Sequence, residues 1–320
     1  MRTTVLSNRP DGVITDPFYR HILADKDLQA SKDYLDLMNN FYFKVMRDAA
    51  ETKDTLVNSE IRCLMQMMFT KGVSMRKMLD GFSFDQDGVH LNSITDHTLL
   101  NTIARTMFES LMGFELITRI PDTDDKRTIL QNVWCASSLT SRLKMFTDEA
   151  EKRFAERFKH ERENIDYCKN EIYKTELYSR LQECDKKEIE KSIKRGEYQL
   201  IIDADEHVKR IAWDDVRQYC NLGTDNLHGV YKYLCNMAHP SYYAMLQFKG
   251  SYKGNFPAFK ELACTATKNA LICMSVFIMD YMLVFPDTQH TFEELDYETQ
   301  FMISLYNDIM RKASMNELQL

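Results

Sequence analysis

The chain has 320 residues and a formal net charge of −7, with 44% hydrophobic and 28% charged residues. This length suffices for one large helical domain or two smaller ones. The acidic balance excludes the overall basic surface of most nucleic-acid-binding proteins, although it is compatible with a local basic groove.

Ten glycines and six prolines interrupt long stretches rich in Leu, Met, Lys, Glu and Arg, a composition that favours helices. We expect an all-α fold, a multi-helix bundle with a long charged helical arm and at most a minor β-hairpin. The expected divisions are a flexible lead over residues 1–16, an N-terminal helical half over 17–146, the charged arm over 147–196 and a C-terminal helical half over 197–320.

The eight cysteines form no CxxC pair, and the N-terminus lacks the apolar core of an export signal. This indicates reduced thiols in a cytoplasmic protein without a structural zinc site. The sequence lacks four common site patterns: phosphate-binding GxxxxGK[ST], nucleophilic GxSxG, zinc-binding HExxH and dinucleotide-binding GxGxxG. We therefore expect neither a metal nor a cofactor.

Along the chain, apolar periodicity predicts helices over residues 28–50, 59–69 and 74–79. Asp85-Gln-Asp-Gly88 then predicts a turn, because the remaining ligands of a calcium loop are missing.

The next predicted helix spans residues 96–120, with Asp96 as its N-cap and Pro121 after its end. Arg105 and Glu109 lie one turn apart on it, and flanking apolar residues draw this ion pair partly out of water. Such a pair acts either as a structural brace or as a holder of a neighbouring polar group. Another helix follows, to about residue 146.

Residues 147–195 are dense in Glu, Lys and Arg around a thin apolar stripe. They predict one helix of up to roughly 50 Å, then a turn near Asp185 and a shorter helix. Residues 198–211 predict a small hairpin. The apolar run 270–285 is too short to cross a bilayer, so we expect a buried helix or a subunit interface and no membrane contact.

The segment most suggestive of a site ends on His239, directly before Pro240. Tyr231, Cys235 and His239 fall on one helical face, with Lys232 and Asn236 in the row beside them. Proline disfavours helix at the preceding residue, so His239 is placed at a helix C-terminus, where the helix dipole favours imidazolium. His239 is then either a proton-transfer group beside a lysine or a structural helix cap.

Two family resemblances follow from these residues. One series of motifs runs in the order Lys209-Arg-Ile-Ala-Trp213, Val216-Arg217, a glycine break and Tyr231-x-Tyr-Leu-Cys-x-x-x-His239-Pro-Ser241. This series resembles the signature of an uncharacterised prokaryotic all-helical family, catalogued as a domain of unknown function (DUF5677). The helix carrying Arg105, Phe108 and Glu109 looks like its other recurring element. Cys235 stands where the family usually has serine.

The Lys232-x6-His239 spacing is also loosely similar to the nuclease helix of HEPN domains, which carry Arg, four to six residues and then His. This similarity implies a dimeric, metal-independent ribonuclease of a bacterial toxin or antiphage system. The implied catalytic residues are His239, Lys232 and Asn236, and those for binding or positioning are Arg105, Glu109, Tyr231 and Arg217. Lysine cannot form the two parallel hydrogen bonds that arginine forms with a phosphate group, so Arg105 or Arg217 is the alternative phosphate contact.

A different function class fits the same sequence. The His239 helix is then part of the core, and the charged arm or the 270–285 helix mediates assembly with a second copy or another protein. RNA and a protein partner are therefore the two expected kinds of partner.

Overall fold

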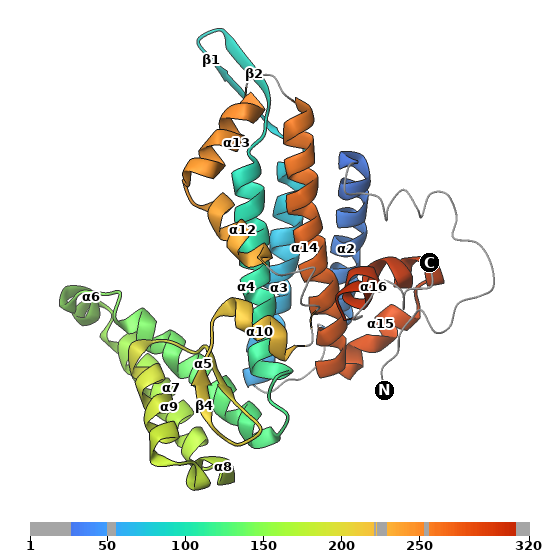
Figure 1. The fold of residues 1–320 in the computed structure, drawn as a ribbon. Coiled ribbons are helices and arrows are strands. Elements are labelled where there is room, and N and C mark those ends of the chain that lie inside the picture. The colour runs from blue at the N-terminus through green and yellow to red at the C-terminus, as the bar shows by residue number, and fades with distance from the viewer. Residues whose placement is uncertain (1–26, 50–55, 221, 223–228, 253–255, 312–320) are drawn as a thin grey trace. The chain divides into compact units, whose positions relative to one another are not determined.

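A computed structural model describes residues 27–49, 56–220, 222, 229–252 and 256–311 (Figure 1). The predicted lead over 1–16 and the glycine break at Gly223 lie outside these residues. Helices predominate in the described part of the chain, where strands form only two antiparallel pairs. This confirms the predicted all-α bundle. The chain divides into two compact units: unit 1 comprises Met1–Leu111 with Asn221–Leu320, and unit 2 comprises Met112–Cys220.

Unit 1 is built around the long helix α14, which spans Phe256–Val284. Its other elements are α2 (Leu28–Asp48), α3 (Leu56–Met78), β1 (Phe82–Gln86), β2 (Val89–Ile94), the first part of α4 (His97–Thr118), α12 (Val230–Ala238), α13 (Tyr242–Tyr252), the short 3-10 helix η3 (Pro286–Thr288), α15 (Gln289–Glu293) and α16 (Tyr297–Arg311). Helices α2, α3 and α16 pack against α14 (Figure 1).

Tyrosine hydroxyls join α2 to the helices beside it. Tyr42 donates a hydrogen bond of 2.7 Å to the carbonyl of Met274 in α14, and Tyr34 donates one to the carbonyl of Met302 in α16. Both tyrosine rings are buried. Each therefore contributes apolar area while its hydroxyl group stays satisfied inside the core.

The predicted buried helix over 270–285 is confirmed as part of α14. Its stretch Ala258–Val284 is long and apolar enough to cross a membrane, but 78% of the apolar window is buried inside the protein. Asp280, which interrupts the apolar run, is 1% exposed and pairs with Arg311 of α16. The burial and this internal ion pair identify α14 as a core helix.

The predicted turn at Asp85–Gly88 is confirmed as the tip of the β1–β2 hairpin. Asp87 and Gly88 both have positive φ, 52° and 77°, between strands paired at Gln86 and Val89. Two successive residues of positive φ are what a tight type I′ hairpin turn requires. The Asp-Gly pair supplies them.

One boundary prediction for unit 1 is wrong. The separate helices expected over 59–69 and 74–79 are the single helix α3, which continues through Gly72. Gly72 is retained in the helix because α2 approaches closely there: a Cβ atom on it would lie 2.3 Å from Asn39 Oδ1 and 3.0 Å from Met274 Cε. The glycine is a packing residue here and does not end the helix.

Unit 2 contains the second part of α4 and the charged segment. Its elements are α5 (Asp124–Leu143), α6 (Asp148–Arg153), α7 (Ala155–Tyr173), α8 (Glu176–Arg180), α9 (Glu183–Arg195), β3 (Leu200–Ile202), β4 (Val208–Arg210) and α10 (Trp213–Tyr219). Helix α5 packs against both α7 and α9. Strands β3 and β4 pair in the register Ile201 to Lys209, which confirms the predicted hairpin.

The single long helix expected after residue 147 is divided into α6, α7 and α8. Helix α7 ends at Tyr173, and Thr175 then caps α8 by accepting from the Tyr178 backbone N–H at 3.2 Å. The Asp125 carboxylate of α5 accepts from the backbone N–H of Leu177 at 2.7 Å, which fixes the new helix start. The turn therefore precedes Glu183, and Asp185 lies inside α9.

Gly72→Ala should lower the stability of unit 1 by about 1–3 kcal/mol, because the new methyl group overlaps buried Asn39 and the packed helices resist displacement. Gly250→Ala is the matched control, since a Cβ atom on this helical residue meets nothing within 4 Å. The control should gain about 0.5–1 kcal/mol from helix propensity. Urea unfolding compares them, and equal stability of both variants would contradict the close approach of α2 and α3.

A second expectation concerns pH. His97 is 1% exposed and neither ring nitrogen has a hydrogen-bond partner among the described residues. Burial lowers the pKa of its imidazole below the usual 6.5, and Asp96 opposes this only in part. The unfolded chain therefore binds the proton more readily, so stability falls as pH drops below about 6.5.

His97→Gln should flatten this loss, as measured by urea midpoints at about pH 8 and about pH 5.5. The same pH dependence in the parent and the variant would assign the effect to other groups.

Candidate functional site

The predicted site residues of unit 1 lie on α4 and α12, two neighbouring helices (Figure 1). Asp96 caps the start of α4, accepting from the Thr98 backbone N–H at 2.8 Å. From there the helix presents Arg105 and Glu109, one turn apart, to α12. The predicted capped helix and its ion pair are both confirmed.

At the end of α12, His-Pro-Ser forms a corner between two helices. His239 has extended backbone angles, φ −100° and ψ 156°, as expected before proline, and its backbone N–H donates to the Cys235 carbonyl. Ser241 Oγ accepts from the Ala244 backbone N–H at 3.1 Å and donates to the Asn236 carbonyl at 2.7 Å. The serine thus caps α13 and ties it to α12, which holds the His239 side chain at an exposed corner.

The side chains of four residues form a connected cluster between the two helices. Arg105 Nη1 lies 3.0 Å from His239 Nε2. Arg105 Nε and Nη2 each lie 3.1 Å from Glu109 Oε1, and the Tyr231 hydroxyl donates to the same oxygen at 2.9 Å. These four residues lie up to 134 positions apart in the sequence, and the fold joins them through one carboxylate and one guanidinium.

The direction of the Arg105–His239 hydrogen bond fixes the histidine tautomer. A guanidinium group can only donate, so Nε2 of His239 must accept. The imidazole in this arrangement is therefore neutral and carries its proton on Nδ1. This is the form of histidine that can take up a proton.

Partial burial tunes the groups around His239. The Arg105 and Glu109 side chains are 25% and 28% exposed. Burial is the largest single influence and acts to lower the pKa of Arg105, but Glu109, Tyr231 and Cys235 together more than offset it and the net shift is upward. Burial and then the hydrogen bond to Glu109 raise the pKa of the Tyr231 hydroxyl. The cluster thus keeps a permanently charged guanidinium and a protonated tyrosine.

Packing holds Tyr231 in place. Its ring stacks on that of buried Phe108, with centroids 5.3 Å apart and an angle of 23° between the planes. The phenol ring is thereby fixed against α4 while its hydroxyl reaches Glu109.

The sequence did not identify Lys71, which lies on α3. Its ammonium donates to Ser110 Oγ at 3.2 Å. Burial lowers the pKa of Lys71, and the nearby Glu109 carboxylate opposes that shift. No spacing rule connects Lys71 with α4 or α12, so only the fold could reveal this second cation.

The other predicted residues lie elsewhere. Lys232 and Asn236 are exposed on the adjacent row of α12. Arg217 belongs to unit 2, where it is 1% exposed and its Nε lies 3.6 Å from Asp214 Oδ1. The cation that the structure puts beside His239 is Arg105, one of the two alternatives to Lys232. The described residues hold no cluster of three or more His, Cys, Asp or Glu side chains suited to a metal ion.

Comparison with known protein families gives a match to part of the chain. Residues 98–255 match a family of unknown function, DUF5677. No curated protein and no solved structure matches the chain significantly. The matched residues include both helices of the cluster, and the predicted likeness to HEPN domains stays a prediction.

Glu109→Gln should lower the pKa of Tyr231 towards its usual value, because the variant removes the carboxylate charge while leaving the ring partly buried. Glu261→Gln, an exposed control on α14, should leave the tyrosine unchanged. Carbon-13 NMR of ring-labelled tyrosine, with Tyr231→Phe for assignment, measures both titrations. An unaltered Tyr231 titration in Glu109→Gln would contradict the described hydrogen bond.

Proposed function

We propose that this chain, whose residues 98–255 match the DUF5677 family, is a metal-independent endoribonuclease whose proton-transfer group is His239. The observation that carries the proposal is the 3.0 Å contact between Arg105 Nη1 and His239 Nε2 at an exposed helix corner. A guanidinium beside a neutral imidazole combines an anion-binding group with a proton acceptor.

The reaction that suits this pair is attack of a ribose 2′-hydroxyl on the adjacent phosphodiester. The O2′–P bond forms as the P–O5′ bond breaks, the 2′-hydroxyl proton passes to Nε2, and the departing 5′-oxygen takes up a proton from water. A cyclic phosphate and a 5′-hydroxyl result. No outside oxidant or metal is needed to balance the step.

Arg105 has a direct role in this scheme. A phosphate oxygen forms stronger, charge-assisted hydrogen bonds with guanidinium than a neutral imidazole does. An entering phosphate therefore draws Arg105 away from Nε2, which frees the histidine lone pair to accept the proton. Glu109 acts as a positioning residue, because it holds the Nε side of the guanidinium and leaves Nη1 directed at His239.

Two further features support an RNA substrate. Tyr242 and Tyr243 follow the His239 corner in the first turn of α13 and are 74% and 50% exposed. Exposed aromatic rings beside a phosphate-binding group are a common platform for unpaired bases. Lys232 adds an exposed positive charge on α12. A dimeric arrangement and a role in bacterial defence or as a toxin belong to this same proposal.

A non-catalytic function has its own supporting observation. Arg105, Glu109, Tyr231 and His239 form a continuous chain of hydrogen bonds that braces α12 on α4. In this alternative His239 ends the helix and the protein is a binding or assembly module. The two functions differ in whether His239 is required for chemistry or only for stability.

His239→Ala should abolish cleavage of mixed cellular RNA in EDTA, with a loss of about 10²–10⁴-fold. Arg105→Ala should cost about 10²–10³-fold, whereas Lys232→Ala should cost less, because its charge is exposed to solvent on the adjacent row of α12. His160→Ala, an exposed histidine of α7 with a 73% exposed side chain, is the matched control. Mapped fragments should carry cyclic phosphate ends.

Thermal unfolding of each variant separates folding from chemistry. Absence of cleavage by the folded parent, with a marked stability loss in His239→Ala, would favour the bracing alternative. Equal cleavage by the parent and a folded His239→Ala would overturn the assignment of His239.

A further inference from the structure

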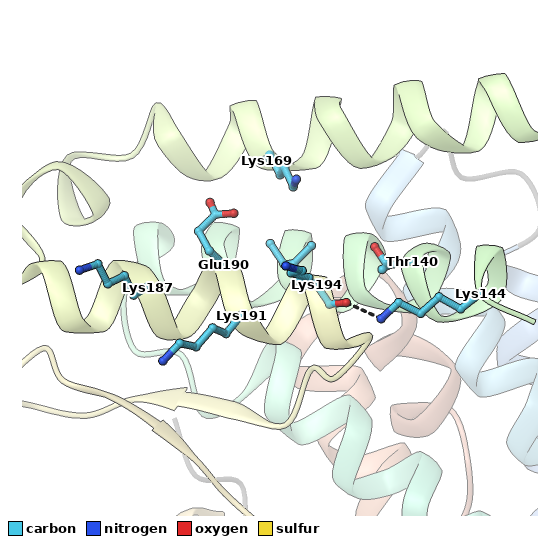
Figure 2. A pocket seen from close by; sticks show the side chains of 8 residues that line it. Thr140, Lys144, Lys169, Lys187, Glu190, Lys191 and Lys194 are labelled. Carbon is cyan, nitrogen blue, oxygen red and sulfur yellow. Dashed lines mark hydrogen bonds between the residues drawn. The ribbon is translucent and has the colours of Figure 1, made fainter.

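Five lysines of unit 2 surround one groove across α5, α7 and α9. The lysine groove is lined by Lys144 at the C-cap of α5, Lys169 of α7, and Lys187, Lys191 and Lys194 of α9, and has a volume of about 500 Å³ (Figure 2). All three helices belong to one compact unit, so the groove is complete within it.

The groove is positive in a protein whose net charge is −7. Its one acidic lining residue, Glu190, accepts a hydrogen bond from the Tyr173 hydroxyl. Lys169, Lys187, Lys191 and Lys194 form no ion pair with the described residues. Nearby lysines outside the groove do: Lys174 pairs with Glu171 and Lys186 with Glu183. Four lysines without an ion pair among the described residues thus lie together in the groove.

The spacing of these lysines suits an extended anion. Lys187, Lys191 and Lys194 lie at i, i+4 and i+7 on one face of α9, a row of roughly 10 Å along the helix axis. Like charges at these spacings repel one another, so an anion lying along the row would relieve the repulsion. The Lys144 ammonium donates to the Lys194 carbonyl, which places another positive charge at the end of the row.

The chemistry of lysine determines what such a row can recognise. Ammonium groups on flexible stems act as point charges and lack the fixed fork with which arginine reads planar groups. They bind phosphates without reading bases. The groove is also lined by Thr140, whose hydroxyl suits contact with sugars, whereas Ile193 beneath it belongs to the buried core.

We propose that the lysine groove binds the phosphate backbone of single-stranded RNA without sequence preference, and so holds the substrate of the ribonuclease proposed above. This inference rests on that function for its substrate. It assigns to unit 2 a binding role that the Arg105–His239 cluster of unit 1 does not supply.

The test is RNA binding by full-length protein carrying His239→Ala, so that the labelled strand stays uncut. Fluorescence anisotropy with an unstructured single-stranded RNA compares that protein with one that also carries Lys187→Ala, Lys191→Ala and Lys194→Ala. The matched control carries Lys44→Ala, Lys152→Ala and Lys159→Ala, three exposed lysines outside the groove. Both triple variants lose the same charge.

The groove variant should bind at least about tenfold more weakly, and the slope of log K against log salt should become shallower by about 2, because three phosphate contacts are lost. The control should bind within about twofold of its parent. Equal weakening in both triple variants, or none in the groove variant, would overturn the inference. Binding of inorganic tripolyphosphate without binding of RNA would overturn it as well.

Cleavage by the parent is measured in parallel and separates the two proposals. If the parent cuts RNA while the groove variant binds it normally, only the groove assignment fails. If the parent does not cut RNA but binds it through the groove, the groove assignment stands and the ribonuclease proposal fails.

Discussion

The apolar second half of α14, over residues 270–284, is the constraint on which unit 1 depends. A helical stretch that is apolar on nearly every side must be surrounded, and α2, α3 and α16 pack against α14. Its polar atoms are satisfied within that core: Ser275 Oγ donates to the Ile303 carbonyl at 2.6 Å, and Asp280 pairs with Arg311. Burial without such partners would cost several kcal/mol for the charge alone. The hydrophobic effect therefore sets the helix arrangement, and a few polar contacts make it specific.

At the surface of unit 1, the candidate site is likewise arranged by the need to pair partly buried charged groups. Glu109 is only 28% exposed, and its Oε1 is stabilised by the Arg105 guanidinium and the Tyr231 hydroxyl. This arrangement fixes the guanidinium so that its remaining donor meets His239. A brace and a pre-oriented phosphate-binding group require the same geometry, which is why stability and activity must be measured on the same variants.

Local signals explain which elements the sequence predicted well. Asp96 and Pro121 bound α4, and Pro240 sets the end of α12, because caps and prolines act on their own backbone. The predictions failed where contacts with segments distant in the sequence determine the helix boundaries. Two helices were expected over 59–69 and 74–79, but a single helix runs through Gly72, where the close approach of Asn39 of α2 explains the glycine. The long charged helix ends at Tyr173 because Thr175 and the distant Asp125 start a new helix there.

The sequence by itself determined the helical class, the place of His239 at a helix end and the Arg105–Glu109 pair, since all of these depend on spacing of a few residues. Only the tertiary structure decided that Arg105, and not Lys232, lies beside His239, because that contact joins residues 134 positions apart. The same holds for Lys71 and for the lysine groove, whose charges come from three helices. Such sites arise from packing of whole helices, which spacing along one helix does not specify.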